Sequence, residues 1–270
     1  MNKTLVLIPS YNDSPDLIRS IKSVDAEEAV DILVVDDGSE IKPEIDVLMT
    51  SYRGKGNVRL LCLQENGGIT KALNAGLRWA DDKGYKFIAR LDAGDIVVGR
   101  RFFVQQKYME ENVGVGVVGS WVDFVTIEGR FLFTLKHPVD NDSIMHCIYR
   151  YNPFVHPATM IRLDCAMKVG GYPHSYPALE DWGLFIAMSR VCDFHNLPEV
   201  YLKYVVSDQS ISSKKRFIQS KSKVCLLLDN YKFNFNQTVG LIKNIFIMFF
   251  PRSYLTFVKR LIWRGGHESS

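Results

Sequence analysis

The feature that most constrains this chain is the regular alternation of strand-like and helix-like segments in its first third. Four short apolar, β-prone runs occur there, at residues 4–8, 32–35, 59–63 and 87–91. The pattern predicts a first helix that starts at Ser14 with Pro15 at its first position, and residues 69–80 repeat apolar side chains at helical spacing. We therefore expect an α/β domain with a parallel sheet covered by helices, whose ligand crevice lies at the carboxyl ends of the strands.

The rest of the chain divides into two parts that differ in pattern and in charge. Residues 113–210 mix strand-like runs with short helices, one of them around residues 181–190, and no linker or repeat separates this part from the first. Residues 211–270 hold eleven Lys and Arg against two Asp and Glu, a net +9, whereas residues 1–210 carry −6. We interpret the two parts as facing different surroundings.

The cysteines and the N-terminal segment favour the cytosol. The five cysteines form no C-x-x-C pair, and an odd number suits a reducing compartment. The opening residues reach Pro9 after only a short apolar run, which is not the shape of a secretory signal.

Polar residues follow the first two predicted strands. The first ends in Pro9-Ser10-Tyr11-Asn12-Asp13 and the second in Asp36-Asp37-Gly38-Ser39. Carboxylates there can accept hydrogen bonds from a nucleoside base or ribose, and the ring of Tyr11 can lie beside the base. The alternative, that D-D-G-S is only a turn and helix cap, is equally compatible with this segment taken alone.

Two more strand ends carry candidate ligand groups. Residues 66–71, Asn-Gly-Gly-Ile-Thr-Lys, open a helix whose free N–H groups and Lys71 suit a phosphate, although neither a dinucleotide fingerprint nor a P-loop occurs. Residues 90–95, Arg-Leu-Asp-Ala-Gly-Asp, place two carboxylates beyond a buried strand, where they suit Mg²⁺ or Mn²⁺ bridging a diphosphate. A simple Asp-containing turn is the alternative.

The middle of the chain offers a candidate base. Asp181, between Glu180 and Trp182, precedes an apolar helical pattern and is either a helix cap or a general base at the edge of a cleft. His156 lies between Pro153 and Pro157 in a stiff loop; a structural hydrogen bond is the more common role for a single histidine.

Taken in order, these segments resemble the family 2 glycosyltransferases, inverting enzymes of the GT-A fold that build bacterial O-antigens, capsules and lipopolysaccharide. The resemblance covers about residues 1–210. It is carried by P-S-Y-N-D at 9–13, V-V-D-D-G-S at 34–39, N-G-G-I-T-K-A-L-N-A-G at 66–76, R-L-D-A-G-D at 90–95 with R-R-F at 100–102, N-P-F-V-H-P at 152–157, and G-G-Y-P with E-D-W within 170–182. Each motif alone is permissive, but their order is specific.

The resemblance implies roles for individual positions. Asp181 occupies the place of the catalytic base, and Glu180 and Trp182 lie on the acceptor side. The residues that it assigns to the nucleotide sugar, usually a uridine diphosphate sugar, are Pro9, Tyr11, Asp13, Asp36, Asp37, Asn66, Lys71, Asn74, Arg90, Asp92 and Ala93. The implied reaction is a single displacement with inversion, in which the base deprotonates an acceptor hydroxyl that attacks the anomeric carbon.

The metal-binding motif departs from the family pattern. The usual D-A-D-D is Asp92-Ala93-Gly94-Asp95 here, so a carboxylate that commonly binds the metal is missing. Either Asp95 replaces it or Asp92 suffices together with oxygens of the diphosphate, and His156 can add an imidazole ligand; the expected cation is Mn²⁺ or Mg²⁺.

The C-terminal segment predicts contact with a membrane surface. Residues 240–250 are apolar but are interrupted by Lys243 and Asn244 and end at Pro251, short of the ~20 residues that span a bilayer. A helical stripe of apolar residues, with basic residues largely elsewhere, follows in 254–264 and suits an anionic interface. Packing on the catalytic domain is the alternative. No nucleic-acid-binding motif accompanies the basic residues.

These observations and the resemblance predict an α/β catalytic domain of the GT-A fold, a mixed sheet flanked by helices, over residues 1–212. Its nucleotide-sugar half is expected at 1–98 and its acceptor half at 99–212, followed by a basic amphipathic helical segment at 213–270. The predicted activity is transfer of a hexose from a UDP-sugar to a lipid-linked, lipopolysaccharide or capsule glycan, at the cytoplasmic face of the membrane. The alternatives are a nucleotidyltransferase, or a non-catalytic membrane-associated protein that binds nucleotide sugars. The sequence does not define the sugar, the linkage, the acceptor or the oligomeric state.

Overall fold

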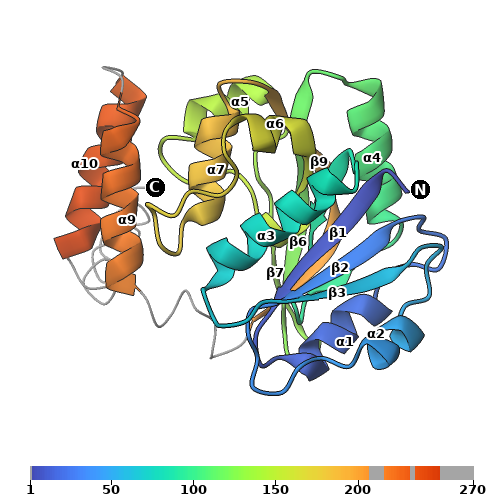
Figure 1. Ribbon diagram of the computed structural model, residues 1–270. Helices are drawn as coiled ribbons and strands as arrows, with labels where there is room; N and C mark the ends of the chain where they lie inside the picture. The colour runs from blue at the N-terminus through green and yellow to red at the C-terminus, as the bar shows by residue number, and fades with distance from the viewer. Residues whose placement is uncertain (1, 207–215, 232–234, 250–270) are drawn as a thin grey trace.

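The computed structural model describes residues 2–206, 216–231 and 235–249 of the 270-residue chain (Figure 1). A single nine-stranded mixed sheet forms the centre of this part, and helices pack on both of its faces.

Four parallel strands form one half of the sheet, in the spatial order β3-β2-β1-β4. They are β1 (Thr4–Ser10), β2 (Asp31–Asp36), β3 (Val58–Cys62) and β4 (Phe87–Arg90). The helices between them are α1 (Ser14–Lys22), α2 (Ile45–Ser51) and α3 (Ile69–Asp82). The four strands and the helix start at Ser14 confirm the sequence prediction, whereas α2 was not singled out by the pattern.

The second half makes the sheet mixed, because β8 runs antiparallel to both β4 and β6. The order continues β8-β6-β9-β5, and β7 pairs only with β6 among the described residues. The strands are β5 (Ile96–Val97), β6 (Val115–Thr126), β7 (Phe131–Leu135), β8 (Met160–Arg162) and β9 (Asp193–Val206). The helices are α4 (Arg101–Glu111), α5 (Asn141–Cys147), the 3-10 turn η1 (His156–Ala158), α6 (Leu163–Lys168) and α7 (Glu180–Met188).

Alternating side chains of β1 build the two hydrophobic layers. Leu5 and Leu7 pack into the core beneath α3, while Val6 and Ile8 pack with Leu17 of α1 on the other face. Successive strand residues point to opposite faces, so an uninterrupted apolar strand is what a sheet covered on both sides requires. The approach of α3 is close, since a Cβ at its Gly76 would lie 2.3 Å from a methyl carbon of Leu7.

The last two helices, α9 (Arg216–Asp229) and α10 (Phe235–Phe249), lie side by side next to α7 (Figure 1). Leu226 and Leu227 of α9 are buried in the same core as α7, and the hydroxyl of Tyr176 donates a 2.9 Å hydrogen bond to Asp229. A Cβ at Gly240 of α10 would lie 2.4 Å from the carbonyl oxygen of Tyr149. This part of the predicted C-terminal segment therefore packs on the domain.

None of the described helices combines the length and the apolar character needed to cross a bilayer. The amphipathic stripe predicted within residues 254–264 lies outside the described residues. Among the side chains of α10 that the structure describes, three apolar ones are nevertheless exposed: Val239, Ile242 and Ile245.

Candidate active site

The carboxyl ends of β1, β2 and β4 meet at one rim of the sheet. The parallel register pairs Ser10 with Asp36 and Leu7 with Arg90, so the segments that follow these strands leave the sheet side by side. This is the rim at which open α/β sheets bind ligands. The predicted nucleotide-sugar residues after the three strands therefore share one edge.

The loops after β1 and β2 are hydrogen-bonded to each other. The backbone N–H of Asn12 donates to Ser39 Oγ at 2.8 Å, and that of Glu40 donates to Asn12 Oδ1 at 3.0 Å. Asn12 adopts a left-handed φ of 51°, a conformation that asparagine adopts more readily than most residues. Tyr11, just before it, is 46% exposed, so its side chain is accessible to a ligand. Asp13 lies beyond it, and burial, then the charge of Asp16, raises its pKa to about 6.

Asp36 and Asp37 shape these loops. Asp36 is fully buried and accepts from the hydroxyl and, at 3.2 Å, the N–H of Ser39. Asp37 accepts from the N–H groups of Gly67 at 3.0 Å and Gly68 at 2.7 Å, and Gly68 is the cap of α3. The two carboxylates thus fix the D-D-G-S turn and the glycine loop, a structural role that the sequence offered only as the alternative for this segment.

The predicted phosphate-side residues separate into two groups. Asn66 is exposed, and Lys71 is partly exposed and forms an ion pair with Glu65 at 3.3 Å, so both are open to a ligand at the start of α3. Asn74 is buried and exchanges two 2.8 Å hydrogen bonds with the backbone of Tyr172, 98 residues away. In this arrangement Asn74 attaches the G-G-Y-P turn to α3.

Arg90 is fully buried beneath the rim and contacts several of the residues there. Its guanidinium forms an ion pair with Asp92, donates to the carbonyl oxygens of Leu7 and Leu91, and lies 3.3 Å from His156 Nε2. The same imidazole nitrogen lies 2.9 Å from the hydroxyl of Tyr172. Burial, reinforced by the charge of Arg90, lowers the pKa of His156 well below its usual value and keeps it neutral.

The three predicted metal ligands do not form a metal centre together. The described residues contain no group of three or more His, Cys, Asp or Glu side chains able to hold an ion. His156 is buried against the cationic Arg90, and Asp95 is buried, with its Oδ1 accepting from the N–H of Val205 at 3.0 Å. Only Asp92, whose side chain is 36% exposed, faces the open rim.

The D-A-G-D loop is fixed by α1. The N–H of Gly94 donates to Ser20 Oγ at 2.8 Å, and Ser20 Oγ donates to the carbonyl oxygen of Asp92 at 3.0 Å. Gly94 has a φ of 101°, a conformation that side chains rarely adopt. The position at which the family usually has a metal-binding aspartate is therefore occupied here by a glycine in a turn that favours glycine. Ala93 in the same loop is half-buried.

The candidate base is held at the start of α7. Asp181 lies in the first helical turn and accepts a 2.7 Å hydrogen bond from Asn152 Nδ2. Burial raises its pKa to about 6, and the charge of Asp92 adds to this effect. The structure therefore brings the predicted base and the D-A-G-D loop within electrostatic reach of each other, although they lie 89 residues apart in the sequence.

The neighbours of Asp181 differ in exposure and contacts. Glu180 is buried, its Oε2 has no hydrogen-bond partner among the described residues, and burial followed by the charge of Asp181 raises its pKa to about 7. Trp182 is 1% exposed and donates a 2.7 Å hydrogen bond to the carbonyl oxygen of Ile148, so its indole anchors α7 in the core.

The mixed sheet and the polar rim at the carboxyl ends of its parallel strands define an α/β protein with a candidate ligand site at that rim, and comparison with known proteins gives its family. The profile described as Glycosyl transferase family 2 matches residues 5–167. The chain belongs to this family, and it is a glycosyltransferase.

Two curated relatives illustrate the family. The Escherichia coli UDP-Gal:alpha-D-GlcNAc-diphosphoundecaprenol beta-1,3-galactosyltransferase is 23% identical, over 87% of this chain and 85% of its own length. The amylovoran biosynthesis glycosyltransferase AmsE of Erwinia amylovora is 29% identical, over 82% of this chain and 83% of its own.

Solved structures support the GT-A fold. The S. aureus TarS fragment 1–349 in complex with UDP-GlcNAc aligns with a TM-score of 0.66 at 16% identity, covering 90% of this chain and 72% of TarS. The mannosyltransferase PcManGT of Pyrobaculum calidifontis, in complex with GDP-Man and Mn²⁺, aligns with a TM-score of 0.62 at 14% identity, covering 90% and 68%. The predicted fold class, a GT-A mixed sheet flanked by helices, is thus confirmed.

Proposed function

We propose that this chain transfers a hexose from a UDP-sugar to a hydroxyl of a lipid-linked, lipopolysaccharide or capsule glycan, with inversion at the anomeric carbon. The observation that carries the proposal is the half-buried Asp181 carboxylate, which accepts a hydrogen bond from Asn152 and lies within electrostatic reach of Asp92 at the rim. The relatives support the donor and acceptor classes, since one is named for a UDP-galactose donor and a diphosphoundecaprenol-linked acceptor. Membership of the family favours a glycosyltransferase over the two alternatives, a nucleotidyltransferase and a non-catalytic protein that binds nucleotide sugars.

In the proposed reaction, Asp181 removes the proton from the acceptor hydroxyl. The acceptor oxygen forms a bond to the anomeric carbon as the bond from that carbon to the diphosphate oxygen breaks, and UDP leaves with the electron pair. A carboxylate with a pKa of about 6 is mostly ionised at neutral pH and still basic enough to accept a proton in the transition state. The rim residues proposed to contact the donor are the exposed Tyr11 and Asn66 and the partly exposed Asp13 and Lys71.

Among the residues that the structure describes, Asp92 is the one predicted ligand that fits a divalent cation, and the remaining ligands would come from diphosphate oxygens and water. Oxygen ligands of this kind suit Mg²⁺ or Mn²⁺. A bound cation would neutralise charge on the leaving diphosphate. Asp95 and His156 are not proposed as ligands, because their contacts are made to Val205, Arg90 and Tyr172.

The proposed place of action is the cytoplasmic face of the membrane. The +9 charge of residues 211–270 supports attraction to anionic lipid, and the exposed apolar side chains of α10 provide apolar surface for the same contact. A lipid-linked acceptor would require such an enzyme to work at the bilayer surface.

The test is transfer by purified protein with UDP-hexoses and a lipid-linked acceptor. Asp181→Asn should lower the rate at least about 100-fold while UDP binds as tightly as before, because the variant loses the base and keeps the rim. Asp82→Asn, at the exposed end of α3, is the matched control and should behave as the parent. Transfer that survives in Asp181→Asn rejects the assignment of the base, and a retained anomeric configuration rejects the single displacement.

A further inference from the structure

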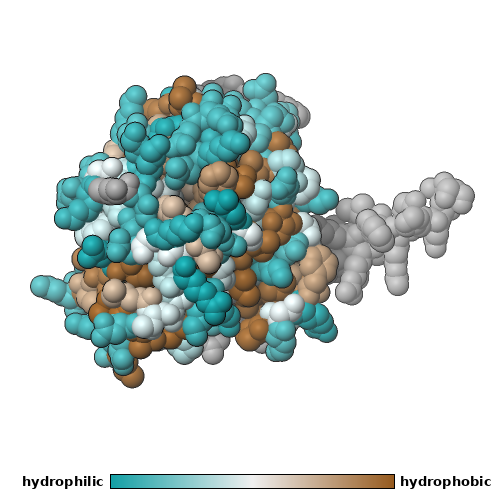
Figure 2. Space-filling view, turned by 90° about the vertical axis from the view of Figure 1, so that its right-hand side faces the viewer, coloured by the Kyte–Doolittle hydropathy of each residue, from teal (hydrophilic) through white to brown (hydrophobic). Residues whose placement is uncertain are grey.

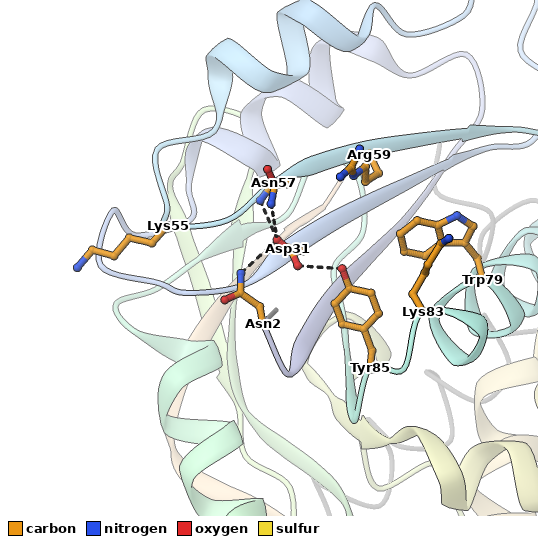
Figure 3. A pocket seen from close by; sticks show the side chains of 8 residues that line it. All are labelled: Asn2, Asp31, Lys55, Asn57, Arg59, Trp79, Lys83 and Tyr85. Carbon is orange, nitrogen blue, oxygen red and sulfur yellow. Dashed lines mark hydrogen bonds between the residues drawn. The ribbon is translucent and has the colours of Figure 1, made fainter.

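A pocket lies at the amino ends of the parallel strands, at the opposite end of the sheet from the rim. It is formed where β2 and β3 begin and α3 ends, and its volume is about 570 Å³, within the range of small-ligand sites (Figure 3). The amino ends of the parallel strands point toward the side of the molecule shown in Figure 2, where hydrophilic residues cover most of the upper half. We call this hollow the basal pocket and describe it by Asp31, Asn57, Arg59, Trp79, Lys83 and Tyr85.

The basal pocket is separate from the donor rim. Asp31 begins β2 and lines the pocket, whereas Asp36 ends β2 at the rim. Five residues of extended strand separate the two by roughly 17 Å. A ligand in one place therefore does not occupy the other.

A buried carboxylate fixes the floor of the pocket. Asp31 is 5% exposed and accepts from the hydroxyl of Tyr85 at 2.8 Å, from the backbone N–H of Asn57 at 2.8 Å and from Asn2 Nδ2 at 3.1 Å (Figure 3). Burial, then the hydrogen bond to Asp31, raises the pKa of Tyr85, so its hydroxyl stays a donor. These contacts organise the floor before any ligand arrives.

One wall is aromatic and cationic. The rings of Trp79 and Tyr85 stack with their centroids 6.0 Å apart and their planes at 25°. Arg59 and Lys83 lie on the same side as Trp79, are exposed, and form no ion pair with any residue that the structure describes (Figure 3). Lys55 instead pairs with Glu27 at 2.5 Å and points away from the others. The wall thus offers two available positive charges beside an apolar ring face.

We propose that the basal pocket binds an acidic saccharide unit of a glycan. The sugar carboxylate would pair with Arg59 and Lys83, and the apolar face of the sugar ring would pack on the indole of Trp79. Asn57 offers an amide for ring hydroxyls. The choice of a saccharide over another anion with a ring rests on the proposed function, because an enzyme that extends glycans gains effective concentration by holding the polymer at a second point.

The probe for this site is tetragalacturonate, with maltotetraose as its neutral counterpart. Protein carrying ¹⁵N-labelled tryptophan has four indole signals, and Trp79→Phe assigns the one that reports on the pocket. Tetragalacturonate should shift the Trp79 signal saturably, and Arg59→Gln or Lys83→Gln should weaken binding by about tenfold or more, the usual effect of losing a hydrogen bond to a charged group. Both substitutions are on exposed side chains, so the fold should tolerate them.

Arg78→Gln is the matched control, because Arg78 precedes Trp79 on α3, is exposed and does not line the pocket. It should bind tetragalacturonate as the parent does, and saturating UDP should leave the shift unchanged. The inference is overturned by the absence of a saturable shift up to roughly 10 mM, by equal affinity for maltotetraose, or by displacement with UDP. If tetragalacturonate does not bind but hexose transfer is observed, only the proposal for the basal pocket is rejected. If tetragalacturonate binds but no hexose transfer is observed, only the proposed function is rejected.

Discussion

The side-chain amide of Asn152 donates a 2.7 Å hydrogen bond to Oδ2 of Asp181, joining the N-P-F-V-H-P loop to the first turn of α7. The bond fixes the direction of the carboxylate, and it stabilises the charged form, which lowers the Asp181 pKa against the larger upward effect of burial. Asn152 is therefore a positioning residue for the proposed base.

The pH dependence of transfer should follow Asp181. Its pKa of about 6 predicts that kcat/KM falls as the pH drops through that value, because the protonated carboxyl no longer accepts a proton. Asn152→Ala removes a donor to the carboxylate, so the acid limb should move to higher pH, and kcat should fall by about tenfold from the lost orientation. The measurement is kcat/KM between pH 5 and 9.

Asn112→Ala, which removes an exposed amide at the end of α4, is the control and should reproduce the parent profile. An acid limb that stays in place in Asn152→Ala, with the rate lowered equally at every pH, would mean that Asn152 acts only through the loop.

Glu180 should cost stability at alkaline pH. Its pKa is raised from 4.5 to about 7, so between these values the folded state binds more protons than the unfolded chain, and stability falls as the pH rises through this window. Glu180→Gln removes the buried charge, and at pH 8 we expect it to raise the free energy of unfolding by about 1 to 3 kcal/mol, seen as a Tm higher by several degrees.

The same variant supplies its own control at pH 4, where Glu180 is mostly protonated in both states and the two proteins should melt at nearly the same temperature. A gain of the same size at both pH values would contradict the explanation through charge, and would indicate better packing of the amide.

The local pattern of the sequence was sufficient to place the rim. The runs ending at Ser10, Asp36 and Arg90 are strongly apolar, and parallel strands must end at one edge, so the polar residues after them were predictable neighbours. The partners of those residues were not predictable. Asn74 to Tyr172 and Arg90 to His156 are contacts across 98 and 66 residues, and local periodicity carries no information on such distances.

The metal ligands show the same limit. The sequence offered Asp95 as a possible second ligand beside Asp92, but in the structure Asp95 follows the positive-φ turn at Gly94 and is buried, accepting a hydrogen bond from the N–H of Val205. The hydrogen bond between Asp95 and Val205 joins the loop after β4 to the end of β9. Local sequence patterns could not predict it, because the two residues lie 110 positions apart.

Metal dependence should therefore separate the two carboxylates. We expect EDTA to stop transfer and Mn²⁺ or Mg²⁺ to restore it. Asp92→Asn should raise the cation concentration for half-maximal activity by about tenfold or more. Asp95→Asn keeps the acceptor for Val205 and should leave that concentration nearly unchanged. Activity that persists after rigorous chelation rejects the cation, and a larger effect from Asp95→Asn rejects the assignment of Asp92.

Membrane attachment should depend on residues 250–270. A chain ending at Phe249 keeps α9 and α10, which pack on the domain, but loses the predicted stripe and four Lys and Arg residues. Each basic residue near an anionic surface contributes about 1 kcal/mol, so the full chain should sediment with vesicles containing phosphatidylglycerol and the shortened one should not. Salt at about 0.5 M should weaken the binding by screening, and Lys259→Glu with Arg260→Glu in the full chain should mimic the truncation. Equal sedimentation of both chains, or equal binding to neutral phosphatidylcholine vesicles, would locate the contact elsewhere, with the exposed apolar residues of α10 as the next surface to change.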